Sequence, residues 1–519
     1  MKNPWISLFI VIGGLTLSAI GHTESVAPSV SYRGETLQGS FSERQPSVAS
    51  FKGIPYARPP VGALRWQAPK APPHRSGVQQ ATHWAPGCYQ DEYNLVWYQK
   101  IATAFGSDSL GFSDPPFSED CLYLNVWSAS LQPQSKQPVL VWIHGGSNKA
   151  GWSFEPNYNG EQMAAQGVVV VSVGYRLGIF GFFGHPELKG QTLPTNFGLL
   201  DQIEALRWVQ AHIARFGGDP HNVTIAGESA GGADVSYLLA SPLAKGLFHR
   251  AISESGGYML PSKRVLGDAE SIGTRLASAR PDKPTLAGLR ALSSAEVFQS
   301  AKRALAKQDY GPVIDGVSVR EPISRSYQTQ GIGVDLLIGT NENEDYMYVD
   351  DRPETLAATL AALPVAARLP LQQRAALEPS TQHANDRVSA LVEMHCPAYV
   401  MAEAVVTGGH RAYVYRFTRV RPGPGGEALL AYHGAEIPYL FDTHDVWLPK
   451  TVEDRALTDA MVHYWSNFVR SGDPNGHGKP QWAAFDTKQP RVQELGARIG
   501  EMAAPDYALC RQLEPMLYR

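Results

Sequence analysis

The sequence predicts an α/β fold in which a central, mostly parallel β-sheet is flanked by helices. Two apolar runs, 138–143 and 168–173, show no alternation of polar and apolar residues, as expected for strands that are covered on both faces. Helical patterns separate such runs along the chain, which is typical of parallel sheets. With 43% hydrophobic and 18% charged residues, the composition is that of an ordinary globular protein.

The other elements follow from periodicity and from turn-forming residues. Apolar residues recur at steps of three and four between 198 and 216, which predicts an amphipathic helix that ends at the Gly-Gly-Asp-Pro segment 217–220. A second helix is expected from Ala230 to Leu239. Further strands are expected at 223–226, 336–338 and 412–415. Insertions around 88–121 and 346–395 interrupt the alternation, and we expect them to form a cap on the sheet core.

The N-terminus has the pattern of an export signal. A short positive start, an apolar stretch over 5–20 and a small-x-small pattern at 19–21 predict that residues 1–21 are a signal peptide. An uncleaved anchor helix is the alternative, but a bilayer span needs about 20 apolar residues. We therefore expect a bacterial-type secreted or periplasmic protein, with residues 22–519 as one domain and no stable membrane span after cleavage.

Charge and cysteine content narrow the class further. A net charge of −4 without a clustered basic segment argues against a nucleic-acid partner. The chain has four cysteines, and an even number behind an export signal predicts disulfides rather than free thiols. Three pairings are possible, and the count alone does not choose among them. The four are Cys88, Cys121, Cys396 and Cys510.

The strongest local motif is the G-x-S-x-G segment 227–231, which lies between a predicted strand and a predicted helix. In this context the motif is typical of the sharp strand-to-helix turn that exposes the nucleophile of an α/β-hydrolase. Flanking glycines are needed because side chains there would clash. The start of the helix also favours negative charge that develops near the serine. The motif therefore predicts Ser229 as a nucleophile.

A nucleophilic serine needs a base and a carboxylate that orients the base. In this fold the histidine follows the acid along the chain, so a histidine in a late loop is expected. His433 fits that position, whereas His410, His444 and His463 are rivals, and His463 falls in a helical run. The acid is expected just after the strand at 336–338. Three carboxylates follow that strand, and the residues alone do not choose among Glu342, Glu344 and Asp345.

Acyl transfer also requires hydrogen-bond donors for the oxyanion. The strand at 138–143 runs into the glycine-rich segment 144–147, whose backbone N–H groups, together with that of Ala230, are candidates. An ordinary glycine turn is the alternative reading. No metal and no cofactor are expected for this chemistry.

Taken together, these segments make the chain similar to the type-B carboxylesterases, which include the cholinesterases. The matching segments cover nearly the whole mature chain: 51–57, 59–60, 64–66, 118–126, 196–202, 227–232, 248–252 and 255–256. The resemblance implies Ser229 as nucleophile, Glu344 as acid and His433 as base. It also implies an oxyanion hole made by the N–H groups of Gly146, Ser147 and Ala230.

The same resemblance implies supporting residues and disulfide pairs. Glu228 and Ser255 match positions that support the histidine, and Cys88 would pair with Cys121 and Cys396 with Cys510. Two residues depart from the family pattern, because Ser147 stands where the third glycine of the oxyanion loop is usual and Asp345 where a glycine follows the acid. A third disulfide of the cholinesterases has no cysteines here, and cholinesterase activity is not implied.

The sequence thus predicts a secreted serine carboxylesterase that hydrolyses a small-molecule ester through an acyl-enzyme. Two alternatives belong to other classes. One is a catalytically silent binding protein, which the complete set of triad residues disfavours. The other is a peptidase of the same fold, for which the sequence shows no pocket for a terminal carboxylate.

Overall fold

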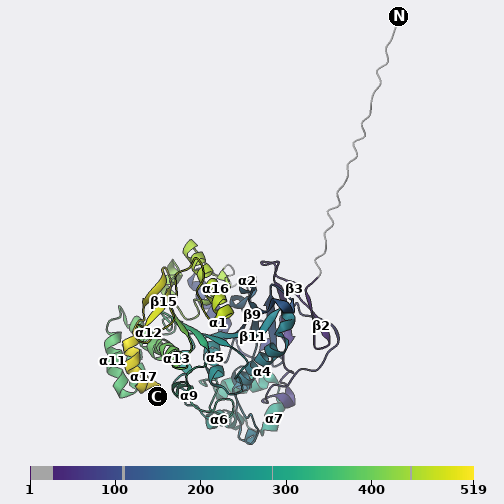
Figure 1. Cartoon of the computed structure of the whole chain (residues 1–519). Coiled ribbons are helices and arrows are strands. Elements are labelled where there is room, and N and C mark those ends of the chain that lie inside the picture. The colour runs from purple at the N-terminus through teal and green to yellow at the C-terminus, as the bar shows by residue number, and fades with distance from the viewer. Residues whose placement is uncertain (2–26, 108–111, 283, 445–446, 519) are drawn as a thin grey trace.

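The structure, a computed structural model, describes Met1 and residues 27–107, 112–282, 284–444 and 447–518 (Figure 1). The predicted signal peptide, apart from Met1, lies outside the described residues. Within the described part, eleven strands form one sheet in the order β16-β15-β14-β13-β12-β11-β9-β10-β8-β4-β3. The strands are β3 (Ser40–Phe41), β4 (Ala49–Pro55), β8 (Tyr123–Ser128), β9 (Gln137–Ile143), β10 (Val169–Val173), β11 (Gly218–Glu228), β12 (Arg250–Glu254), β13 (Asp335–Asn341), β14 (Ala412–Phe417), β15 (Arg491–Leu495) and β16 (Ile499–Ala503).

The centre of this sheet is parallel, as the sequence predicts. Neighbouring strands from β10 through β9, β11, β12, β13 and β14 to β15 all pair in parallel. The antiparallel pairs lie toward the two edges, where β8, β4 and β3 extend one side and β16 the other. Two small sheets accompany the large one: β1 (Ser29–Tyr32) with β2 (Glu35–Gln38) and β5 (Gly77–Gln80), and β6 (Gly87–Cys88) with β7 (Phe117–Ser118).

Helices cover both faces of the sheet (Figure 1). They are α1 (Tyr93–Ala104), α2 (Glu161–Ala165), α3 (Gly178–Gly181), α4 (Phe197–His212), α5 (Ala230–Ala240), α6 (Leu266–Ser278), α7 (Leu286–Ala291), α8 (Ser294–Ala304), α9 (Ile323–Gln330), α10 (Pro353–Ala362), α11 (Val365–Ala375), α12 (Thr381–Ala390), α13 (Cys396–Thr407), α14 (Pro424–Leu429), α15 (Ile437–Phe441), α16 (Val452–Ser471) and α17 (Tyr507–Leu517). This arrangement is the α/β-hydrolase fold.

Strand β9 shows why its sequence lacks alternation. Val139 and Val141 belong to one hydrophobic core, which α4, α5 and α13 cover. Leu140 and Trp142 belong to a second core on the opposite face, which α2, α15 and α16 cover. Because successive side chains of a strand point to opposite faces, a strand covered on both sides must be apolar throughout.

One predicted boundary differs from the structure. Helix α4 ends at His212, a 3₁₀ turn covers Ile213–Phe216, and β11 already begins at Gly218. The Gly-Gly-Asp-Pro segment therefore ends the helix but also opens the strand. The pairing of β11 with β9 shifts register between Gly218 and Val223, so the turn-forming residues Asp219 and Pro220 sit in this irregular part of the strand.

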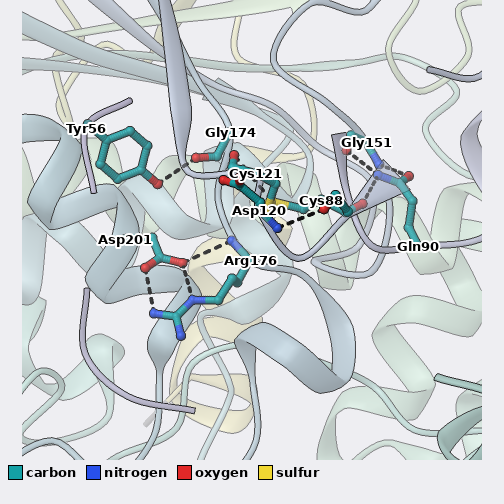
Figure 2. Close-up of a disulfide and its surroundings, with 10 residues drawn as sticks. Tyr56, Cys88, Gln90, Asp120, Cys121, Gly151, Gly174, Arg176 and Asp201 are labelled. Carbon is teal, nitrogen blue, oxygen red and sulfur yellow. Dashed lines mark hydrogen bonds and ion pairs between the residues drawn. A yellow bond between two sulfur atoms is a disulfide. The ribbon is translucent and has the colours of Figure 1, made fainter. Parts of the chain in front are cut away.

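Both disulfides have the pairing that the resemblance implies. Cys88 is bonded to Cys121, which closes the first insertion, and Cys396 is bonded to Cys510, which ties α17 to α13. Near the first disulfide, Gln90 exchanges two hydrogen bonds of 2.7 Å with the backbone of Gly151 (Figure 2). The first insertion is thereby fixed to the segment that follows β9. No helix in the described ranges is both long and apolar enough to cross a membrane.

Candidate active site

The G-x-S-x-G segment forms a sharp turn between β11 and α5. Ser229 has φ of 55°, a conformation that non-glycine residues rarely adopt. A Cβ atom on Gly227 would lie 2.5 Å from the carbonyl carbon of Gly231, and one on Gly231 would lie 2.0 Å from the carbonyl oxygen of Ile143. The predicted steric reason for both glycines is therefore present. The N–H of Ser229 donates to the carbonyl of Glu254, which anchors the turn to β12.

His433 and Glu344 form the hydrogen bond that a base and its orienting acid require. Nδ1 of His433 lies 2.7 Å from Oε2 of Glu344. The other carboxylate oxygen of Glu344 accepts a hydrogen bond of 2.6 Å from the Ser255 hydroxyl and one of 2.7 Å from the Asn341 N–H. Glu344 is fully buried, so these bonds determine its orientation. With the Nδ1 proton held by Glu344, Nε2 of His433 is left to accept a proton.

Glu228 is the second carboxylate close to His433. Its Oε1 lies 3.3 Å from Nε2 of His433. Burial raises the pKa of Glu228 above that of an ordinary glutamate, and the charge of His433 opposes this rise. Burial would lower the pKa of His433, but the carboxylates of Glu228 and Glu344 outweigh burial and raise it. The charge of each group therefore shifts the pKa of the other.

The loop after β9 runs alongside the nucleophile turn. A Cβ atom on Gly145 would lie 3.1 Å from Cβ of Ser229, so the loop and the nucleophile are in close contact. Gly146 has φ of 99° and Ser147 has φ of 56°. Among the described residues, no hydrogen-bond acceptor is found for the N–H groups of Gly146, Ser147 or Ala230. These donors are available to a ligand.

A buried polar pair, which the sequence analysis missed, holds this loop against α5. Nδ2 of Asn148 donates a hydrogen bond of 3.1 Å to Asp234, whose other oxygen accepts one of 2.5 Å from Gln202. Asp234 is fully buried, and Asn148 has φ of 56°. Asp234 lies one helical turn beyond the nucleophile turn, so the pair links the two backbone segments that surround Ser229. In the sequence, the only sign of this pair is an aspartate at an inward-facing position of an apolar helix.

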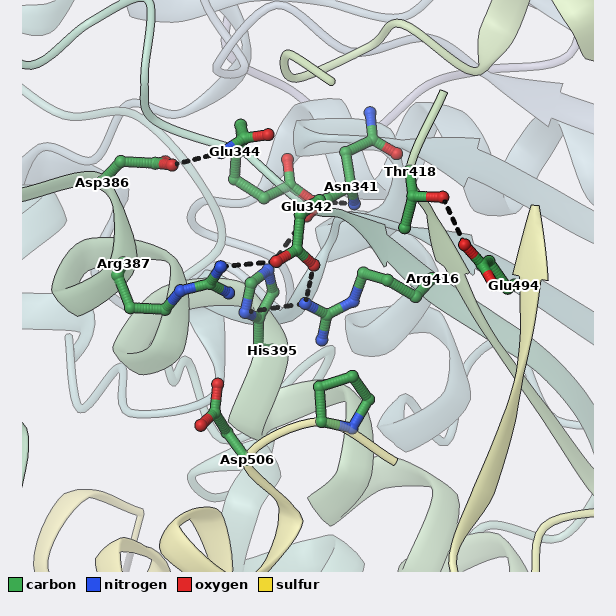
Figure 3. A network of polar contacts seen from close by, with 12 residues as sticks. Asn341, Glu342, Glu344, Asp386, Arg387, His395, Arg416, Thr418, Glu494 and Asp506 are labelled. Atoms are coloured by element: carbon green, nitrogen blue, oxygen red, sulfur yellow. Dashed lines mark hydrogen bonds and ion pairs between the residues drawn. The ribbon is translucent and has the colours of Figure 1, made fainter. Parts of the chain in front are cut away.

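Apart from Asp345, which lines the same cavity as Ser229 and His433, the rival candidates lie elsewhere or have other partners. Glu342 forms ion pairs with Arg387 and Arg416, beside His395, in the network of Figure 3. His410 faces Asp335. The remaining two histidines are also engaged in other contacts: the rings of His444 and His463 contact Thr458 and Asn467, respectively.

The predicted residues converge on one cavity of about 260 Å³. Gly146, Ser147, Glu228, Ser229 and His433 all line it, while Glu344 and Ser255 stand behind the histidine. Both insertions also contribute to its walls. The first supplies Tyr93, Asn94, Trp97 and Tyr98, and the second supplies Tyr348, Glu393 and Met394.

Glu393 and Met394 reach the cavity from an unusual helical turn. The segment Leu391–His395 is a π-helix between α12 and α13, and such turns often occur at functional sites. The sequence predicted an insertion here but not this turn. Across the described residues, no group of three or more His, Cys, Asp or Glu side chains is arranged to hold a metal ion.

A fold of this kind, with serine, histidine and glutamate at the carboxyl ends of parallel strands, defines the class of α/β-hydrolases. The comparisons with known proteins are more specific, because residues 27–508 match the model of the carboxylesterase family. The chain belongs to this family.

Relatives along the whole chain agree with that assignment. The chain is 34% identical to a medium-chain fatty acyl-CoA hydrolase precursor of Anas platyrhynchos, over 93% of this chain and 91% of the relative. It is 35% identical to the cocaine esterase of Homo sapiens, over 86% and 83% of the two chains. Among solved structures, a PNB esterase superimposes with a TM-score of 0.80 at 30% identity, covering 95% of this chain and 99% of the other.

Proposed function

We propose that the protein hydrolyses carboxylic esters through an acyl-enzyme formed on Ser229. The observation that carries the proposal is the position of His433, which is hydrogen-bonded to Glu344 at Nδ1 and lines the same cavity as Ser229. Membership of the carboxylesterase family supports the same reaction class.

In the first half-reaction, Oγ of Ser229 attacks the carbonyl carbon of the ester while Nε2 of His433 takes its proton. The N–H groups of Gly146, Ser147 and Ala230 stabilise the resulting oxyanion. The ester C–O bond then breaks, and His433 gives the proton to the departing alcohol. The acyl group remains on Ser229.

In the second half-reaction, water attacks the acyl carbon and gives a proton to His433. The carboxylic acid leaves, and the proton returns to Oγ of Ser229. Glu344 holds the imidazole in the required tautomer, and Ser255 orients Glu344. We assign Glu228 to a supporting role, because its carboxylate stabilises positive charge on His433.

We also propose that residues 1–21 are a signal peptide and that residues 22–519 form one exported domain. Two disulfides support export, because such bonds persist in oxidising compartments. A single sheet that extends from residue 40 to residue 503 supports one domain. The protein would then be secreted or periplasmic.

Substitution of Ser229 by Ala tests the proposal. We expect the variant to keep its melting temperature and to lose hydrolysis of a neutral aryl ester by at least about 10³-fold in kcat, as in other serine hydrolases that lack one triad member. Ser271, which is exposed on α6, provides the matched control as Ser271→Ala. A Ser229→Ala variant that retains a tenth of the wild-type kcat would disprove the assignment.

A further inference from the structure

A second cavity, of about 380 Å³, lies beside the candidate active site. Tyr93 lines both cavities, and so the two are neighbours. The loop after β9 separates them: Ser147 lines the first cavity, and Lys149, two residues further, lines the second. The carbonyl of Asn148 accepts a hydrogen bond of 2.7 Å from the N–H of Gly178, another lining residue of the second cavity.

The second cavity has an apolar floor. Ile179, Ala301 and Leu305 line it and are almost fully buried in the main hydrophobic core. Phe298 completes the floor and packs against Tyr89, with 5.3 Å between the ring centroids. An apolar tail that displaced water from this floor would gain hydrophobic free energy.

Two lysines stand at the rim of this floor. Lys302 forms an ion pair of 3.5 Å with Asp91, so these two charges compensate each other. Nζ of Lys149 lies 4.3 Å from the ring centroid of Tyr93, and none of the ion pairs found among the described residues involves it. Lys149 is therefore the one lysine of the described cavity lining for which no ion pair is found.

The active-site cavity differs from the second cavity in its charged residues. Glu228, Asp345 and Glu393 line it, and its described lining contains no lysine or arginine. Burial and the charge of Asp345 together raise the pKa of Glu393 to about 7, against the opposing charge of His433. Lys149, on the far side of the loop, is the lysine that can attract a carboxylate to the second cavity.

We propose that the second cavity is a binding site for a monocarboxylate with an apolar tail, with the carboxylate at Lys149 and the tail on Phe298 and Leu305. This is the chemical class of the acid that ester hydrolysis releases. That link to the reaction rests on the proposed function, but the binding site itself does not.

Calorimetric titration with octanoate tests the site directly. We expect Lys149→Gln to weaken octanoate binding by about tenfold, since it removes the donor of a charge-assisted hydrogen bond. Lys307→Gln is the matched control, because Lys307 is also exposed but does not line the cavity. We expect this control to bind octanoate like the wild type.

A second variant tests the cavity rather than the charge. Ala306 lines the cavity and is exposed, so Ala306→Trp can occupy the space without disturbing the core. We expect it to abolish octanoate binding while kcat for a small ester stays within twofold of the wild type. The neutral analogue 1-octanol should bind the wild type at least about tenfold more weakly than octanoate does.

Three outcomes would overturn the proposal. Octanoate binding that is unchanged in both Lys149→Gln and Ala306→Trp would place the ligand elsewhere. Equal affinities for octanoate and 1-octanol would show that the site does not select an anion. Undetectable binding of octanoate to the wild type would show that the cavity is no site for this class. Calorimetry does not require turnover, so an inactive protein that binds octanoate would contradict only the proposed function.

Discussion

The nucleophile turn and the cap differ in how the sequence determines them. The turn occupies five consecutive residues, 227–231, and its two glycines are required by close contacts within the turn and with the carbonyl oxygen of Ile143 on the neighbouring strand. The cap joins two segments more than 200 residues apart, through a hydrogen bond of 2.8 Å from Trp97 to Tyr348 and one from Lys100 to the carbonyl of Met347. The nucleophile turn can therefore be recognised from five consecutive residues, whereas the shape of the cavity depends on contacts between segments far apart in the chain.

The largest effect on activity is expected from substitution of Glu344, the proposed acid. Glu344→Gln replaces the carboxylate that accepts from Nδ1 of His433 by an amide, whose NH2 group favours the wrong tautomer of the imidazole. The equivalent aspartate-to-asparagine change in another serine hydrolase costs about 10⁴ in kcat. We expect a loss of at least about 10³ in kcat with little change in melting temperature.

Glu342→Gln provides the control, because Glu342 pairs with Arg387 and Arg416 instead. We expect it to lower the melting temperature while kcat changes less than about tenfold, since the substitution leaves two buried arginines without their partly buried partner. The opposite ranking of the two variants in kcat would move the acid to Glu342.

The next effect concerns the loop that supplies the oxyanion donors. Asn148→Ala removes the bond to Asp234 and leaves that buried carboxylate with one donor fewer. Small displacements of catalytic groups can cost up to about 10²-fold, so we expect kcat to fall by about 10- to 100-fold with KM within twofold. Steady-state kinetics on a small aryl ester measures both. A change in KM alone would mean that Asn148 shapes the cavity rather than the donors.

A smaller effect is expected on the pH dependence of kcat/KM. A base must be neutral to accept the serine proton, so kcat/KM falls when His433 becomes protonated. Because the pKa of His433 is raised, we expect this fall to occur at a higher pH than the ordinary histidine pKa of about 6.5. Glu228→Gln removes one carboxylate that raises this pKa. We therefore expect the midpoint of the acid limb to move to lower pH in the variant. An unchanged or higher midpoint would exclude Glu228 as a cause of the shift.

The smallest effect concerns the cap. Trp97→Phe removes the hydrogen bond to Tyr348 but keeps an aromatic ring in the cavity wall. We expect kcat for a small acetate ester to stay within twofold and KM for a bulky ester to change about threefold or more, as a pocket contact contributes about 1 kcal/mol. Equal losses for both esters would show that the cap also positions the catalytic groups.

The same contrast explains what could be predicted from the sequence. The parallel strands, the turn at Ser229 and the late loop of His433 follow from periodicity and chain order. The choice among Glu342, Glu344 and Asp345 came from the resemblance, because adjacent carboxylates differ only in where their side chains point. The strand boundary at Gly218 was misplaced because turn-forming residues can also occupy an irregular strand. The pair of Asn148 and Asp234 and the π-helical turn depend on packing between distant segments.

The most direct test of the central claim is the mass of the purified protein after reaction with a fluorophosphonate, which modifies activated serines. We predict one adduct per chain, which peptide mapping locates on Ser229, and complete loss of ester hydrolysis. The Ser229→Ala variant should form no adduct. An adduct on another serine, or hydrolysis that survives full modification of Ser229, would contradict the central claim.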